Sequence, residues 1–271
     1  MAITTFIPKV WSARLLANLE KALVFAPLFN RDYEGEIAQF GDTVHINTLA
    51  GISVKKYTPN TDIDDPEQLT TTDQTLVIDE GNYFNFYLND VDAAQSRSDL
   101  MDGAMRNAAY AIADKVDQYL AGKLLAAATI TESADIASKS NAINAYDSVV
   151  KLKTAMDKKN APKTGRVLVV TPEFEAAMLM DNRFVSAGVQ ASEDRLVNGN
   201  VFRAAGFEIH VSNNLTTACV AFSRDAATYA EQIVKTEAYR REKGFDDGVK
   251  GMHLCGAKVT RPDIVAKLTL A

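Results

Sequence analysis

The stretch Ser98–Ala128, SDLMDGAMRNAAYAIADKVDQYLAGKLLAAA, predicts one long helix. Its apolar side chains recur at steps of three to five residues and so form one stripe of a helix with 3.6 residues per turn: Met101, Met105, Ala108, Ile112, Val116, Tyr119 and Leu124. Ser98 suits the N-cap, and Asp99 and Asp102 suit the first turn, where the helix dipole favours anions. At about 1.5 Å per residue such a helix is roughly 40–45 Å long, well beyond the usual length of about 11–12 residues. We therefore expect a scaffold element.

Two glycines, Gly103 and Gly122, lie near the two ends of this helix. Each costs roughly 1 kcal/mol against alanine, so each needs a packing reason or a role at a helix end. We predict that they are points where a spine helix bends.

Composition and charge fit a soluble globular protein. The chain has 271 residues, 47% of them hydrophobic and 24% charged, which suffices for one large or two modest domains. Its net charge of −6 argues against a basic surface that wraps nucleic acid. Cys219 and Cys255 form no CxxC motif and are expected to be buried thiols of a reducing compartment.

Membrane and secretion signals are not expected. No stretch approaches 18 uninterrupted apolar residues, so we expect no membrane partner. At the amino end, Pro8, Lys9 and Arg14 interrupt any apolar run, which argues against a signal peptide.

The first 30 residues predict a short amphipathic helix over 8–24. Trp11, Leu15, Leu19 and Leu23 share one face, away from Arg14. This face either packs on its own domain or belongs to an arm that reaches a neighbouring chain. Both interpretations remain open on the residues alone.

Residues 41–88 predict a long β-hairpin with a polar tip. Residues 43–47 alternate with period two, 52 and 54 continue the pattern, and strands are expected again over 75–78 and 83–88. The tip, residues 59–73, is polar and contains two prolines. Because a two-stranded ribbon is marginal in water, this hairpin must lie on another surface.

The charge of the hairpin is one-sided. From Tyr57 to Ser96 there is no Lys or Arg, but there are nine acidic residues: Asp62, Asp64, Asp65, Glu67, Asp73, Asp79, Glu80, Asp90 and Asp92. The pattern fits a solvated face or a face that docks on a basic surface of another subunit. It lacks the glycine and the distant glutamate of an EF-hand loop, so no calcium site is expected.

The second half alternates strand and helix over 143–235, as a compact α/β unit does. After a connection over 131–146, the predicted helices cover 146–159, 171–180 and 226–233, and the predicted strands cover 166–170, 207–211 and 219–222. Thr171 and Pro172 are a typical helix start. Strands then return at 236–241, 252–259 and 263–270, with tight turns at Gly244, Gly248 and Gly251.

Catalytic chemistry has little support. His45, His210 and His253 fall in three separate predicted strands without the spacing of metal ligands. There is no GxSxG, Walker A, GxGxxG or HExxH motif. We expect no catalytic, cofactor or metal site, and no enzyme.

The order of these parts resembles the major capsid protein of a tailed bacteriophage with the Hong Kong 97-type fold. Local phrases support the resemblance to coat proteins of the gene 5 type: Asn30–Glu34 with Gly41–Val44, Ala113–Asp117, Leu168–Pro172, Leu196–Gly199, Gly206–Asn213, Glu237–Arg240 and Gly256–Pro262. Each phrase is weakly specific, but the ordered set spans essentially the whole chain.

The resemblance implies an α+β fold with four parts. They are an N-terminal arm (1–40), an extended β-hairpin loop (41–88), a peripheral domain of spine helix and closing strands (89–130 and 236–271) and an α/β axial domain (131–235). It implies that the loop lies on a neighbouring subunit and that axial domains meet at fivefold and sixfold centres. The expected intersubunit contacts are Trp11, Arg14, Lys55, Lys56, Asp62, Asp64, Asp65 and Glu67. We see no basis for a covalent crosslink at Lys55 or Lys56.

The resemblance also implies partners and a location. The protein is expected to self-assemble as pentamers and hexamers into an icosahedral shell that encloses double-stranded DNA, with only weak, local DNA contact. Because no long segment precedes the arm, a separate scaffolding protein is expected, along with a portal. Assembly is expected in the host bacterial cytoplasm, and the product is the virion capsid. Two alternatives stay open: a nanocompartment shell of the same fold, and a soluble α/β enzyme.

Overall fold

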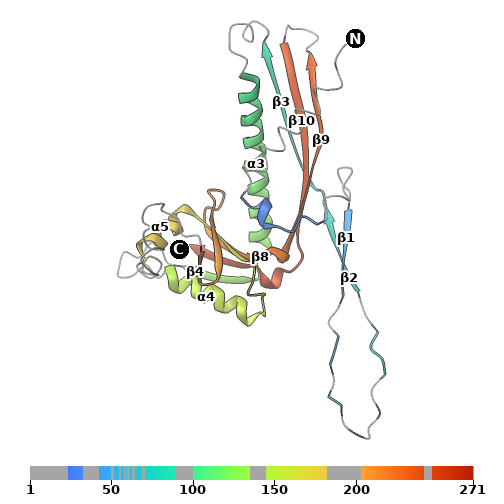
Figure 1. The fold of residues 1–271 in the computed structure, drawn as a ribbon, viewed down its shortest axis with the longest axis vertical. Helices are drawn as coiled ribbons and strands as arrows, with labels where there is room; N and C mark the ends of the chain where they lie inside the picture. The colour runs from blue at the N-terminus through green and yellow to red at the C-terminus, as the bar shows by residue number, and fades with distance from the viewer. Residues whose placement is uncertain are drawn as a thin grey trace.

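The computed structural model describes residues 24–32, 43–49, 52–54, 56–57, 59, 62, 65–68, 71–89, 100–134, 145–181, 203–240 and 246–270. They form a long narrow part, built on helix α3 and a three-stranded sheet, and a compact part built on a six-stranded sheet (Figure 1). A two-stranded ladder lies beside the long sheet, and the chain beyond it extends away from both parts.

Helix α3 spans Leu100–Ala127 and confirms the predicted long helix to within two residues at each end. Its buried side chains lie on one stripe: Met105, Ala109, Ile112, Ala113, Val116, Leu120, Ala121 and Leu124. This stripe packs on the long sheet and on the compact part, so burial rather than propensity alone holds the 28 residues helical.

The long sheet has the order β3-β10-β9 and is antiparallel throughout. Its strands are β3 (Glu80–Asn89), β10 (Asp246–Val259) and β9 (Ala227–Arg240). On the face toward α3, Phe84, Phe86 and Val249 pack against Met105 and Ala109. Figure 1 shows the helix running along the sheet for most of its length.

Two expectations about the long sheet are wrong. The segment 226–233, predicted as a helix, instead contains the start of β9. Residues 227–231 are all buried, so the sequence lacks the alternation of apolar and polar residues that indicates a strand. Gly248 and Gly251 lie within β10 rather than in turns. Each accommodates an aromatic ring over the backbone: a Cβ at Gly248 would lie 2.6 Å from the Tyr239 ring, and the Phe84 ring occupies the equivalent space at Gly251. Gly244 lies outside the described residues.

The predicted hairpin is confirmed in part. Strands β1 (Thr43–Leu49) and β2 (Thr71–Val77) form an antiparallel ladder in which Thr43 faces Val77. The apolar side of the ladder packs on Ala230 of β9 and Leu254 of β10, through Val44, Ile46, Leu76 and Ile78. The expected continuation of the hairpin over 83–88 is wrong, because β3 pairs with β10 instead.

The six-stranded sheet has the order β4-β11-β8-β5-β7-β6. Its strands are β4 (Ile130–Ala134), β11 (Ala266–Leu270), β8 (Ala218–Ser223), β5 (Arg166–Val170), β7 (Phe207–Val211) and β6 (Arg203–Ala204). The pairs β4–β11 and β5–β7 are parallel, and the other three are antiparallel. Helices α4 (Ala145–Lys158) and α5 (Pro172–Met180) contact each other, and both confirm predicted helices. The hydroxyl of Thr171 caps α5 by accepting from Phe174 N, as the sequence predicts.

Two strands of this sheet were not expected there. Strand β4 occupies part of the predicted connection over 131–146, and its partner β11 comes from the far end of the chain. The closing strand over 266–270 therefore belongs to the compact part, not to the peripheral sheet with β9 and β10. Short 3-10 turns at Ala26–Leu28 (η1), Arg224–Ala226 (η3) and Pro262–Ile264 (η4) complete the described elements.

The core joins the two parts. Phe25 and Phe29, on either side of η1, are buried with α3 and the six-stranded sheet, and the Phe29 and Phe222 ring centroids lie 5.7 Å apart. Cys219 and Cys255 are buried free thiols, as predicted, and burial raises the pKa of the Cys219 thiol to about 11. No described helix combines the length and apolarity needed to cross a bilayer.

Candidate functional site

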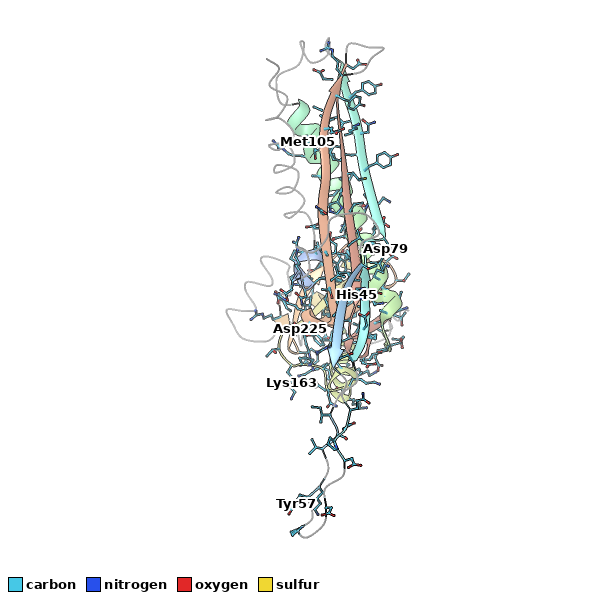
Figure 2. All side chains as sticks on the ribbon, turned by 90° about the vertical axis from the view of Figure 1, so that its right-hand side faces the viewer. His45, Tyr57, Asp79, Met105, Lys163 and Asp225 are labelled. Atoms are coloured by element: carbon cyan, nitrogen blue, oxygen red, sulfur yellow. The ribbon has the colours of Figure 1, made fainter. Side chains whose placement is uncertain are left out.

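The described residues between β1 and β2 form an extended loop that leaves the rest of the chain. Val54 and Tyr57 are 96% and 69% exposed, and Ile52 is similarly open. Figure 2 shows Tyr57 near the end of the loop, far below the body of the molecule. The two sides of the loop are tied where Ser53 donates from N and Oγ to Glu67 Oε2, the former over 3.1 Å. The hydroxyl and amide of Ser53 lower the pKa of Glu67.

The predicted contact residues fall into two groups. Lys56, Asp62, Asp65 and Glu67 are all exposed on the extended loop. Trp11, Arg14, Lys55 and Asp64 lie outside the described residues. The structure thus brings the acidic positions that it describes onto one projecting element, away from the core.

Asp79 fixes the base of the loop to the spine helix. It lies between β2 and β3, and its carboxylate accepts from the Tyr119 hydroxyl and from Lys123 Nζ at 2.9 Å. Burial works to raise the pKa of Asp79, but the Tyr119 and Lys123 contacts lower it overall. Ala257 N in turn donates to Tyr119 Oη at 3.3 Å, so one hydroxyl joins the loop base, α3 and β10.

A second carboxylate on α3 holds the segment 24–32. Asp117 is buried and accepts backbone N–H groups from Val24 and Phe25 at 3.1 and 3.3 Å. Burial raises the pKa of Asp117 to about 6, against the lowering effect of these two hydrogen bonds. The carboxylate thereby satisfies amide groups at the start of η1 that would otherwise be orphaned near the core.

The other end of the same segment is held by Glu231 of β9. Its carboxylate pairs with Arg31, accepts from Tyr229 Oη at 2.7 Å and lies 3.1 Å from His253 Nε2. Burial works to raise the pKa of Glu231, but His253, Tyr229 and Arg31 lower it overall. Asn30 N and O also bond the backbone of Ala227 and Tyr229. The chain is therefore docked on its own β9 over 30–31, before it continues toward β1.

The sheet face away from α3 carries tyrosines. By register, Tyr83 faces Met252, Asn85 faces Lys250, and Tyr87 faces Gly248 on this side, which we call the open face. Tyr83 is 81% exposed, and Tyr87 and Met252 are also exposed. The Tyr239 hydroxyl donates to Asn85 Oδ1 at 2.7 Å, and Lys250 pairs with Glu237 at 3.0 Å. The base of this face is already covered by the chain's own β1–β2 ladder, through Leu254.

The anchoring residues Asp79, Asp117, Tyr119 and Glu231 were missed from the sequence. Asp117 could have been predicted as an anchoring residue, because it falls between Val116 and Leu120 on the apolar stripe of a helix, where a buried carboxylate needs hydrogen-bond partners. The others depend on contacts across the fold. Among the described residues no group of three or more His, Cys, Asp or Glu could hold a metal ion.

A phage capsid protein family model matches residues 70–268, which is most of the chain. The chain belongs to the phage capsid protein family. It is a major capsid shell protein of the Hong Kong 97-type fold, with a structural role and a place in the virion.

Solved structures agree with the family. The capsid protein is similar to a chain of Mycobacterium phage Che8, with 28% identity, a TM-score of 0.75, and coverage of 91% of this chain and 90% of that one. The fold also matches the capsid of cyanophage P-SCSP1u (18% identity, TM-score 0.72, coverage 92% and 88%) and the mature capsid of bacteriophage PhiM1 (15%, 0.67, 90% and 88%). No curated protein matches the chain. The nanocompartment and enzyme alternatives are not favoured, since the family model is that of phage capsid proteins.

Proposed function

We propose that this capsid protein self-assembles, as pentamers and hexamers, into the icosahedral head shell of a tailed bacteriophage and encloses its double-stranded DNA. The observation that carries the proposal is the extended loop, whose described apolar side chains Ile52, Val54 and Tyr57 are exposed. Apolar groups at the end of a projecting ribbon gain stability only if another surface covers them. In a shell, that surface belongs to a neighbouring subunit.

The open face of the long sheet is the surface that fits this loop. Tyr83, Tyr87 and Met252 offer apolar area, and the Lys250–Glu237 pair leaves the middle of the face without net charge. The chain's own β1–β2 ladder already packs at the base of this face. A second copy's loop would extend that covering toward the far end of the sheet.

Charge gives the loop a second means of docking. Asp62, Asp65 and Glu67 are exposed, and no cation lies between Tyr57 and Ser96. Such a surface repels other loops and is attracted to lysine or arginine side chains of an adjacent subunit. Assembly is then sensitive to salt, since exposed pairs are screened within about 8–10 Å at physiological ionic strength.

The spine helix sets the distance between contacts. Asp79 ties the loop base to Tyr119 and Lys123 of α3, and the six-stranded sheet packs beyond its C-terminal half. We assign the peripheral domain to α3 with β3, β9 and β10, and the axial domain to the six-stranded sheet with α4 and α5. Gly103 and Gly122 remain our proposed bend points of the spine.

Interface geometry, not catalysis, performs this function. A separate scaffolding protein, a portal and assembly in the host bacterial cytoplasm complete the proposal, and membership of the phage capsid family is their support. Contact with the packaged DNA is local, because the chain carries a net charge of −6.

Charge reversal in the loop tests the docking. The variant Asp62→Lys/Asp65→Lys is compared with Asp225→Lys/Asp263→Lys, which makes the same charge change at two exposed residues outside the loop. We expect the loop variant to remain as small oligomers in 150 mM salt while the control forms shells, as counted by electron microscopy. Equal shell yields from the two variants would contradict loop docking.

A further inference from the structure

Five lysines gather on α4 and the turn that follows it: Lys151, Lys153, Lys158, Lys159 and Lys163. All but the half-buried Lys153 are exposed, and Figure 2 shows Lys163 at the lower end of the body. We call them the lysine cluster. Between residues 151 and 163 the single acidic residue is Asp157. The cluster therefore concentrates positive charge on a chain that is negative overall.

A buried arginine, Arg166, forms a salt bridge with Asp157. Arg166 Nη2 pairs with Asp157 Oδ1 at 2.6 Å, and the arginine side chain is 2% exposed. The hydrogen bond from Arg166 lowers the pKa of Asp157, and the charges of Lys163 and Lys153 lower it further. The one carboxylate within the cluster is thus already paired with a buried arginine, and it is outnumbered by five lysines.

The same arginine holds the turn in shape. Arg166 Nε donates to Pro162 O at 2.6 Å and Nη2 to Ala161 O at 2.8 Å. Two residues beyond α4, Asn160 lies in the left-handed region (φ 56°), and Ala161 N donates to Met156 O. This geometry turns the chain so that Lys163 follows closely on Lys158 and Lys159 at the helix end, where cations also complement the dipole.

The cluster differs from the other described cations in density, with five lysines within 13 residues. Lys123, Lys250 and Arg224 each pair with a carboxylate of their own chain. Within the described ranges, no lysine of the cluster forms an ion pair. Lysines at this density create a positive local potential that attracts anions.

We propose that the lysine cluster binds the phosphate backbone of the packaged double-stranded DNA. The inference rests on the proposed function, since it assigns the shell's local DNA contact to a surface. Lysines suit this ligand because they act as mobile point charges against a regular row of phosphates. A fixed site for carboxylates of a neighbouring loop would favour exposed arginine forks, whereas the arginine of this stretch is buried.

Two triple variants with the same charge change test the proposal. Lys158→Gln/Lys159→Gln/Lys163→Gln removes most of the cluster, and Arg106→Gln/Lys115→Gln/Lys258→Gln removes three exposed cations from α3 and β10. Binding of full-length unassembled protein to a random-sequence DNA duplex is measured from 50 to 300 mM NaCl. Each lost phosphate contact lowers the slope of log affinity against log salt by about 0.9.

We expect the cluster variant to lose about two to three units of this slope, and the control less than about one. Equal losses, or an unchanged slope in the cluster variant, overturn the proposal. Shells are counted for both variants by electron microscopy. If the cluster variant binds DNA normally but forms no shells, the cluster is a subunit contact for an acidic loop and the proposal is wrong. Absence of shells in the wild type would contradict the proposed function instead.

Discussion

The Tyr119 hydroxyl donates to the carboxylate of Asp79 and accepts from Ala257 N, so one side chain of α3 joins the loop base to the long sheet. Residues 40 apart in the sequence are thereby fixed at the point where the extended loop leaves the body. Figure 2 shows Asp79 beside the lower part of the long sheet, above the β1–β2 ladder. The direction of the loop therefore depends on this junction.

Tyr119→Phe should loosen that junction. The change removes a hydrogen bond to a carboxylate and leaves Ala257 N without its acceptor, which together cost about 1–3 kcal/mol. We expect Tm to fall by about 2–6 °C and protease cleavage within 50–70 to speed up. Tyr110→Phe is the control, because Tyr110 is 70% exposed on the same helix. Equal behaviour of the two variants would contradict the role given to Tyr119.

Asp117 should make a distinctive contribution to the pH dependence of stability. Its pKa in the folded protein is about 6, above the ordinary 3.8, so its contribution favours folding at low pH and is lost as pH rises from about 4 to 6. Asparagine does not titrate and keeps one acceptor for Val24 or Phe25. We expect Asp117→Asn to be less stable than wild type at pH 4 and to recover by on the order of 2–3 kcal/mol at pH 7.

Thermal unfolding at pH 4 and pH 7 measures the difference, with the exposed Asp225→Asn as control. A constant offset between Asp117→Asn and wild type across this range would show that burial does not shift the titration of Asp117. Asp117→Ala should cost more at both pH values, since it leaves both amide groups without an acceptor.

Replacing the spine glycines, Gly103 and Gly122, with alanine should raise the stability of the helix. A Cβ at Gly103 or Gly122 would meet nothing within 4 Å, so packing does not require either glycine. Each alanine variant should gain up to about 1 kcal/mol of helix stability. If the spine bends at these positions, Gly103→Ala and Gly122→Ala shells should form but fail to reach the mature diameter by electron microscopy. Normal maturation of both variants would rule out the bend.

Trp11 offers a spectroscopic test of the N-terminal arm. It is the single Trp of the chain, and its apolar helix face is predicted to be buried between subunits. We expect its fluorescence maximum to move to shorter wavelength when subunits assemble into shells. An emission maximum that stays at the solvent-exposed position in shells would place Trp11 outside the interfaces.

Local patterns predicted the elements whose burial is one-sided. Helices α3 and α4 each have a stripe of apolar residues, and Thr171–Pro172 is a typical start for α5. The short buried strands β5 and β8 were visible as continuous apolar runs. In each of these cases the pattern of neighbouring residues in the sequence is enough to predict the element.

The long sheet shows where local patterns fail. Tyr229, Ala230 and Glu231 are buried together, so β9 lacks alternation, and its Ala- and Glu-containing sequence favours helix by propensity alone. Gly248 and Gly251 look like turn residues in the sequence. In the structure they are strand residues that leave room for the rings of Tyr239 and Phe84 over the backbone. Both facts depend on pairing partners elsewhere in the chain.

The candidate site was predictable only in its outline. The acidic loop is visible in the sequence as a charge pattern. The contacts that hold its base and the preceding segment join single side chains of distant elements: Asp79 with Tyr119, and Glu231 with Arg31. Strand β3 was assigned to the hairpin because it follows β2 directly, whereas its partner β10 lies more than 150 residues away. A sequence does not display such pairings.

The central claim is that the contacts that build a closed shell lie within this chain. Electron microscopy of the purified full-length protein, at concentrations that permit assembly, measures this directly. We predict closed icosahedral particles of uniform diameter, or capsomers of five and six subunits that close when salt and concentration are adjusted. A protein that stays monomeric or forms only small soluble oligomers under all these conditions would contradict the claim.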